Sequence, residues 1–133
     1  MSQKNVEIVR QHIEAFLHDT ATSLSFLDPS VVFDRRRVGT PDSEVVYGHE
    51  AVVQAVRRHI GTFEEYAYQV DRLTDLGSGA VLAVVNETGR GKGSGVPVRR
   101  SLATLYTVIE GKIVRMTVFR SQEQALEAAG LRE

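Results

Sequence analysis

The second half of the chain is dominated by four long segments with the composition of β-strands. β-Branched and aromatic residues recur in these segments, and Gly77, Gly79 and Gly111 mark the breaks between them. Such residues are typical of strands, and glycine is typical of tight turns, so the pattern predicts a run of antiparallel strands. Strands of this length twist, and the sheet they form should therefore curve strongly. The expected strands are residues 66–76, 80–88, 98–109 and 113–120.

Most of the helices are expected before this run of strands. Apolar residues follow a helical period along the first segments, and Asp28 before Pro29 ends one of them. After the sheet, Ser121 and Gln124 have the spacing of a capping box for a last short helix. The elements expected before the sheet are helices at residues 6–17, 20–27 and 48–61 and strands at residues 31–35 and 45–47.

This order of elements does not alternate strands with helices, as a parallel βαβ fold would. It predicts an α+β fold in which helices pack on a strongly curved, mixed and mainly antiparallel sheet. A curved sheet backed by helices encloses a cone-shaped pocket. The length of 133 residues suits one hydrophobic core, so a single domain is expected over residues 1–133.

Charge, cysteine content and hydropathy exclude several classes of function. The chain has 16 Lys and Arg against 17 Asp and Glu, and a net charge of -1 provides no field to hold nucleic acid or an anionic membrane. Without cysteine, the chain has no disulfides, no thiolate chemistry and no zinc site built on sulfur. No apolar run approaches the roughly 20 residues that span a bilayer, and residues 1–7 lack the layout of a secretion signal. We expect a soluble, cytoplasmic protein that binds neither nucleic acid nor membranes.

Four stretches of the sequence match the patterns of a known family. They are Tyr47-Gly48-His49-Glu50-Ala51, the glycine-rich residues 89–95, residues 111–116, and the tail over residues 123–131. Together with the order of elements, they resemble the SnoaL-like branch of the nuclear transport factor 2-like superfamily, which also holds ketosteroid isomerase and limonene epoxide hydrolase. The resemblance spans nearly the whole chain and implies a cystatin-like α+β roll with a ligand pocket. Members include isomerases, cyclases, hydrolases and non-catalytic binding modules, so the resemblance specifies the fold better than the activity.

The resemblance also implies roles for two residues. Matching the first helix and strand to ketosteroid isomerase puts His12 where that enzyme has a tyrosine oxyanion donor, and Asp34 where it has the general-base aspartate. The second oxyanion donor of that enzyme falls near Leu105. Residues 98–109 and 113–120 contain no Asp or Glu. The late-strand acids of ketosteroid isomerase, of limonene epoxide hydrolase and of SnoaL-type cyclases are therefore missing from these segments.

Asp34 is the first catalytic candidate by its own chemistry. A carboxylate on a strand that leads into an apolar cavity can have its pKa raised by desolvation and act as a proton acceptor. The alternative is an ion pair, because the strand period of two places Arg36 on the same face as Asp34. Arg36 would then hold Asp34 ionised and make the pair an anchor for a polar ligand atom. Tyr47 is expected to help position such a ligand.

His12 is the second catalytic candidate, on the apolar stripe of the first helix. It can orient Asp34 or donate a hydrogen bond to a developing oxyanion, and the alternative is a core histidine with one satisfied hydrogen bond. His59 lies similarly near the end of the third helix and is expected at the pocket rim or in a structural role. Phe16, Leu105 and Met116 are expected to form apolar walls of the pocket.

No metal or cofactor is expected, because the sequence has neither a His-Glu-x-x-His motif nor a phosphate-binding loop. Two functions remain open. One is an enzyme that uses Asp34 and His12 for cofactor-independent isomerisation, cyclisation or hydrolysis of a small hydrophobic molecule with a polar group. The other is a non-catalytic ligand-binding or dimerisation module. Both faces of the strand at residues 98–109 are largely apolar or neutral, which predicts a homodimer through the outer face of the sheet.

Overall fold

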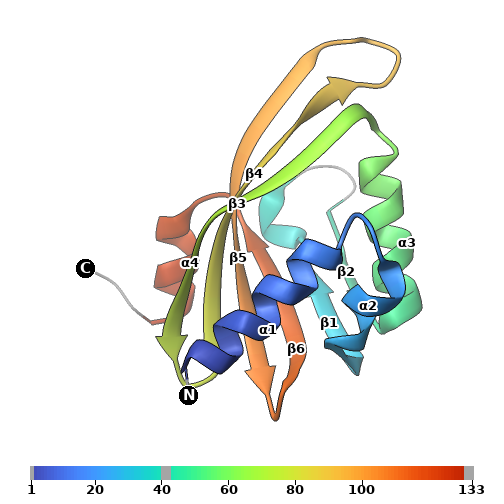
Figure 1. Cartoon of the computed structure of the whole chain (residues 1–133). Coiled ribbons are helices and arrows are strands. Elements are labelled where there is room, and N and C mark those ends of the chain that lie inside the picture. The colour runs from blue at the N-terminus through green and yellow to red at the C-terminus, as the bar shows by residue number, and fades with distance from the viewer. Residues whose placement is uncertain (1, 40–42, 131–133) are drawn as a thin grey trace.

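The structure is a computed structural model that describes residues 2–39 and 43–130 (Figure 1). It contains four α-helices, one short 3-10 helix and six strands within these ranges. The helices are α1 (Ser2–Ala15), α2 (Thr20–Ser25), η1 (Arg36–Val38), α3 (His49–Ile60) and α4 (Gln122–Ala128). The strands are β1 (Leu27–Asp34), β2 (Val45–Tyr47), β3 (Phe63–Gly77), β4 (Ala80–Gly91), β5 (Pro97–Ile109) and β6 (Lys112–Phe119).

All six strands form one mixed sheet in the order β2-β1-β6-β5-β4-β3. The pairing of β1 with β6 is parallel and places Phe33 opposite Met116, whereas all other pairs are antiparallel. The α+β class and the mixed, mainly antiparallel sheet predicted from the sequence are therefore confirmed.

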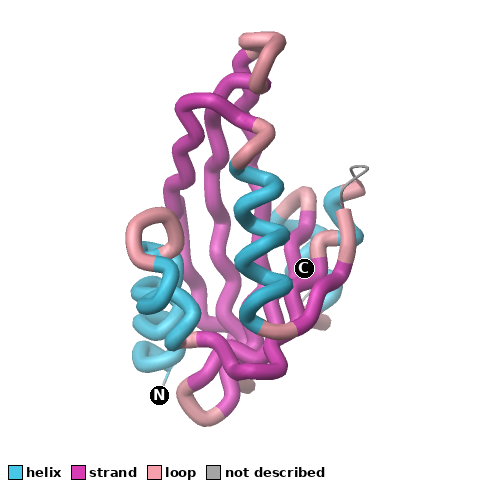
Figure 2. The backbone as a smooth tube through the Cα atoms, turned by 90° about the vertical axis from the view of Figure 1, so that its right-hand side faces the viewer, coloured by secondary structure: helices cyan, strands magenta, loops and turns pink. Residues whose placement is uncertain are grey.

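Helices cover both faces of the sheet, but unequally. Helix α1 crosses one face, here called the inner face, with α2 and α3 beside it, while α4 lies against the opposite, outer face (Figures 1 and 2). The main core between the inner face and its helices contains Val9, Val31 and Ile113, each fully buried. A smaller cluster on the outer face joins Phe119 to Ala125 of α4. The homodimer expected through the outer face stays a prediction.

Several elements begin or end at residues other than those predicted. The sequence pattern predicts Leu27 at the end of the second helix, but Leu27 opens β1 and pairs with Ile113. The register of β1 against β6 shifts between Leu27 and Val32, and this irregularity accommodates Pro29. Pairing with a distant strand has thus overridden the local helical pattern. No helix among the described residues is long and apolar enough to cross a membrane.

The cap of α4 agrees with the sequence pattern. The Ser121 side chain accepts a hydrogen bond from the Gln124 backbone N–H at 3.1 Å. This bond satisfies one of the amide groups that a helix start leaves without a partner. Residues 131–133, which include the last residue of the family-like tail, lie outside the described ranges.

The turn between β3 and β4 gives a test of backbone requirements. A Cβ at Gly79, which has a φ of +85°, would lie 2.6 Å from the Val108 carbonyl oxygen. We expect Gly79→Ala to lower the free energy of unfolding by about 2–4 kcal/mol, through left-handed strain and this backbone clash. Gly93→Ala is the matched control, because Gly93 has a φ of +88° but no atom within 4 Å of its Cβ position. It should cost only about 1 kcal/mol. If urea unfolding shows that both variants lose the same free energy of unfolding, the close approach of Gly79 to Val108 is contradicted.

Candidate functional site

A cavity of about 330 Å³ lies between the inner face of the sheet and helices α1, α2 and α3. Its wall is mainly apolar, and it includes Phe16 of the turn after α1 and Met116 of β6. Both histidines that the sequence singled out, His12 and His59, line the same cavity. The size and lining are those of a pocket for a small organic molecule.

The first polar group of the pocket is His12 with Ser23, which joins α1 to α2. The Nδ1 atom of His12 lies 2.9 Å from the Ser23 carbonyl oxygen, and the Ser23 hydroxyl donates to the His12 carbonyl at 3.2 Å. A carbonyl oxygen can only accept, so Nδ1 carries the hydrogen and Nε2 keeps a lone pair. Burial lowers the pKa of His12, against a smaller opposing effect of the Ser23 carbonyl. The ring is therefore a neutral acceptor at pH 7.

Two tyrosines, Tyr68 and Tyr106, also line the cavity. The Tyr106 ring lies edge-on to His12 with the ring centroids 6.1 Å apart, and the Tyr68 ring lies 5.1 Å from that of Phe16. The Tyr68 and Tyr106 hydroxyls interact with each other. Burial raises the pKa of both phenols above the usual value of 10.0. They therefore remain protonated, and the pair retains one O–H that can donate to a ligand.

The second polar group is centred on Glu87 of β4, a residue that the sequence interpretation missed. Glu87 is 2% exposed and lines the cavity. Its Oε2 lies 2.6 Å from the His59 Nε2 and accepts from the Tyr66 hydroxyl at 2.6 Å. Its Oε1 accepts from the Arg100 Nε at 3.1 Å and from the Arg100 Nη2 at 2.9 Å. Burial alone would raise the pKa of Glu87, but the hydrogen bonds from His59, Tyr66 and Arg100 lower it to about 2.

The sequence contained a signal for this group. Val81, Ala83 and Val85 alternate along β4 towards the core, and Glu87 continues the same period of two. A charged residue on an otherwise apolar inner stripe is expensive to bury without partners. Arg100 stands directly opposite Glu87 on β5 and supplies the charge. Glu87 lies on β4, one strand before the two late strands on which the family resemblance implies acids.

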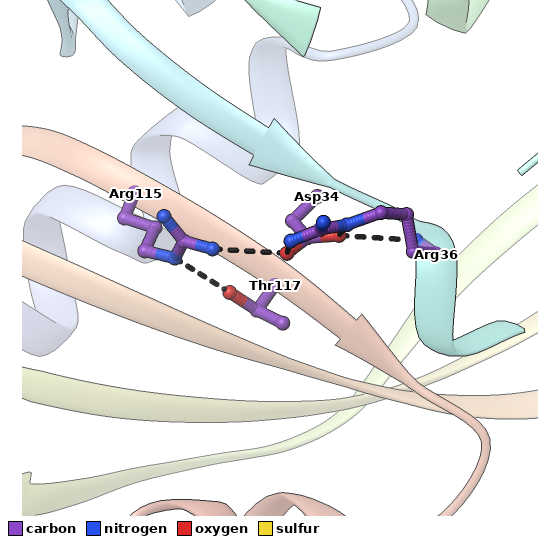
Figure 3. Close-up of polar contacts among 4 residues, drawn as sticks. All are labelled: Asp34, Arg36, Arg115 and Thr117. Atoms are coloured by element: carbon purple, nitrogen blue, oxygen red, sulfur yellow. Dashed lines mark hydrogen bonds and ion pairs between the residues drawn. The ribbon is translucent and has the colours of Figure 1, made fainter. Parts of the chain in front are cut away.

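The structure places Asp34 away from the pocket, which corrects its predicted position. Phe33 and Arg35 line the cavity, so the alternation of the strand turns Asp34 to the outer face. There its carboxylate accepts from the Arg36 Nε at 3.0 Å, and from the Arg36 Nη2 at 2.8 Å and the Arg115 Nη2 at 2.9 Å (Figure 3). Arg115 also donates to the Thr117 hydroxyl at 3.1 Å. Hydrogen bonding from Arg36 lowers the pKa of Asp34 to about 2. The ion-pair alternative is what the structure shows, and Asp34 does not contact His12.

Three residues expected to bind a ligand also lie outside the cavity wall. The Arg36 side chain is held by Asp34 and is largely exposed, and Tyr47 on the edge strand is 65% exposed. Leu105 pairs with Thr117 and packs in the outer cluster covered by α4. The sequence indicated the strands of Tyr47 and Leu105 correctly, and pairing decided their edge and face, whereas Arg36 lies in η1, beyond the end of β1. Among the described residues, no group of three or more His, Asp or Glu is arranged to hold a metal ion.

The two buried carboxylates predict an acid-sensitive stability. Because the pKa of Glu87 and of Asp34 is about 2 in the folded chain, the unfolded chain takes up protons first as the pH falls. The contribution of these two carboxylates to the free energy of unfolding should therefore be constant above about pH 5 and decrease from there towards pH 2. Glu87→Gln should lower stability at pH 7 and reduce this decrease, measured by urea unfolding at several pH values. An unchanged pH dependence in this variant would contradict the buried ionised state of Glu87.

Comparisons with known proteins agree with this architecture. The family model of the SnoaL-like domain matches residues 9–116. An NTF2-like protein from Burkholderia thailandensis is 24% identical, with a TM-score of 0.79 over 97% of this chain and 98% of that one. A protein with a ketosteroid isomerase-like fold from Catenulispora acidiphila, crystallised in complex with trimethylamine, is 17% identical, with a TM-score of 0.72 over 94% and 93% of the two chains.

A protein with a cystatin-like fold from Xanthomonas campestris is 22% identical, with a TM-score of 0.71 over 97% of this chain and 98% of that one. A search of curated proteins found no match. At these identities the solved structures establish a shared fold and leave activity open. The resemblance inferred from the sequence motifs is confirmed.

Proposed function

Because the chain belongs to the family of SnoaL-like domains, we propose that its pocket binds a small, mainly apolar molecule with a carbonyl group and exchanges a proton with that molecule through His12. The observation that carries the proposal is the state of His12: a buried, neutral imidazole on an apolar wall, with Nδ1 held by Ser23. A general base needs a lone pair at a defined position and a conjugate acid that can return the proton. The Nε2 atom of His12 meets both requirements.

The proton transfer uses only groups of this chain. The Nε2 atom of His12 takes a proton from the carbon next to the carbonyl group, and the electron pair of that C–H bond moves onto the carbonyl oxygen. The free O–H of the Tyr68 and Tyr106 pair donates a hydrogen bond to this oxygen and stabilises the enolate. The proton then returns from Nε2 to the same or a conjugated carbon. Return to the same carbon gives hydrogen exchange, and return to the conjugated carbon gives isomerisation.

The carboxylates of Glu87 and Asp34 are poor alternatives to His12 as the base. Glu87 accepts four hydrogen bonds, and its pKa of about 2 makes it a weak proton acceptor. Asp34 is bound by two arginines on the opposite face of the sheet. These hydrogen bonds and positions favour His12 over an aspartate or glutamate as the base.

The same lack of a free carboxylate favours a second candidate, a ligand-binding module without turnover. In that case His12 and the tyrosines would position a polar ligand atom by hydrogen bonding alone. The two candidates share the ligand class and differ in whether the bound molecule exchanges a proton.

Deuterium exchange into 2-tetralone, an apolar ketone with acidic C–H bonds, separates the two candidates. We expect the protein to accelerate exchange in D₂O, followed by NMR, and His12→Gln to reduce the acceleration by roughly 100-fold or more, the usual contribution of a general base. Since the pKa of His12 is lowered from 6.5, the rate should decrease only below about pH 6.5, where the imidazole becomes protonated.

His18→Gln is the matched control, because His18 is exposed and does not line the cavity. The His18→Gln variant should accelerate deuterium exchange into the ketone as much as the unaltered protein does. Binding of 2-tetralone without accelerated exchange would reject the enzyme and leave the binding module. Mass spectrometry of any molecule that co-purifies with the protein would then identify its ligand.

A further inference from the structure

We propose that the ligand of this pocket carries a carboxylate group, which binds Arg57 of α3 where the cavity opens to solvent, while the ketone lies deeper, beside His12. This inference rests on the proposed function of the same pocket and specifies its substrate class. The class is a keto acid in which an apolar body separates the carboxylate from the carbonyl group. A neutral ketone would leave the guanidinium group of Arg57 without a partner.

The exposure of the lining residues identifies the mouth of the cavity, by which we mean its opening to solvent. Of the described residues that line the cavity, three are exposed, namely Leu17, Thr20 and Arg57, and the others are buried or half-buried. Leu17 lies in the turn between α1 and α2, and Thr20 begins α2. The mouth therefore lies between this turn and α3.

Arg57 lies on the flank of α3 that faces the cavity. Val53, about one turn before Arg57, and Ile60, nearly one turn after it, line the same cavity. Successive residues of a helix point about 100° apart, so the next residue, Arg58, points elsewhere. Its guanidinium group forms an ion pair with the Glu44 carboxylate, and it does not line the cavity. The cation at the mouth is thus Arg57.

The charge of Arg57 is not matched within the described part of the chain. No hydrogen bond or ion pair joins its side chain to another described residue. By contrast, Arg58, Arg90 and Arg100 each form an ion pair with a glutamate. An unmatched cation on the rim of an apolar cavity favours a ligand that brings one negative charge.

The charged residues deeper in the cavity offer no comparable site for an anion. Glu87 is buried, and a two-point ion pair with Arg100 matches its charge. Arg35 is also buried and already takes part in an interaction within the protein. A carboxylate placed among the apolar residues of the interior would lose its hydration, whereas at the mouth it keeps water on one side. The carboxylate therefore belongs at the mouth.

The groups at the mouth fit a carboxylate in number and in kind. A guanidinium group can donate two parallel hydrogen bonds to the two oxygens of a carboxylate. The Thr20 hydroxyl, which forms no hydrogen bond with another described residue, can donate one more. Leu17 is 40% exposed, and the apolar body of the ligand would cover it. A phosphate dianion would instead bring a second charge that no cation at the mouth matches.

The position of His12 sets the approximate distance between the two ends of the ligand. Leu17 at the mouth follows His12 by five residues, which corresponds to roughly 7 Å at 1.5 Å per residue. A fused two-ring skeleton with the ketone at one end and the carboxylate at the other spans a similar distance. The substrate class is therefore a keto acid with the two groups on opposite ends of such a skeleton.

Three ketones with one skeleton test the inference: 2-tetralone, 2-tetralone-6-carboxylate and the neutral 2-tetralone-6-carboxamide. Isothermal titration calorimetry gives their dissociation constants. The unaltered protein should bind the carboxylate about fivefold more tightly than the carboxamide, which corresponds to about 1 kcal/mol for an ion pair at an exposed position. Added salt should reduce this preference, because salt screens exposed charges.

Arg57→Gln should abolish the preference for the carboxylate and leave the affinity for 2-tetralone within twofold. Arg58→Gln is the matched control, because it removes the same charge from the neighbouring residue without altering the cavity wall. The Arg58→Gln variant should keep the preference of the unaltered protein. Both positions are exposed, so both variants should fold.

Two results would overturn the inference. One is an affinity of the unaltered protein for the carboxylate that does not exceed its affinity for the carboxamide. The other is a preference that persists in Arg57→Gln, because the anion would then bind elsewhere in the protein. If 2-tetralone binds and exchanges without any preference for the carboxylate, the inference fails and the proposed function stands. If none of the three ketones binds, the proposed function fails as well.

Discussion

The parallel pairing of β1 with β6 is the interaction on which the rest of this structure depends. It joins residues 27–34 to the last long strand, more than 80 positions later, and so attaches the helical first half of the chain to the sheet of the second half. Phe33 stands opposite Met116, and both line the cavity. Asp34 and Thr117, the next pair, face outwards together. A shift of one residue would exchange these two faces, because side chains alternate along a strand.

Hydrogen bonds within the protein hold the polar groups of the pocket. They leave only part of the hydrogen-bonding capacity of these groups to a ligand. Ser23 occupies one nitrogen of His12, Glu87 occupies one nitrogen of His59, and Arg100 and Tyr66 saturate the remaining capacity of Glu87. Each of these bonds offsets the cost of burying its group. The Nε2 lone pair of His12 and one phenolic hydrogen remain available to a ligand. The pocket thus combines an apolar interior with a small number of fixed hydrogen-bonding positions.

Much of the fold was predictable from local patterns. The four long strands, their glycine turns and the cap of α4 were each inferred from residue types within a few positions of one another, and all are present. Errors occurred where a distant partner decided the outcome. Leu27 joined a strand instead of a helix because Ile113 pairs with it, and β3 begins at Phe63 instead of residue 66 because Phe63 pairs with Gly91. Among the site residues, His12, His59, Phe16 and Met116 lie on the cavity wall, whereas Asp34, Arg36, Tyr47 and Leu105 do not.

By itself, the sequence determined the element types, the curved mixed sheet with helices against it, and the apolar character of the pocket, because these follow from short-range periodicity and composition. Only the tertiary structure decided which carboxylate enters the pocket and in which state. Strand register places Glu87 in the pocket and turns Asp34 away from it. The pKa of each carboxylate depends on arginines, which cross-strand pairing or the chain beyond the strand end brings close. Contacts between residues distant in sequence set these properties, and no local pattern encodes them.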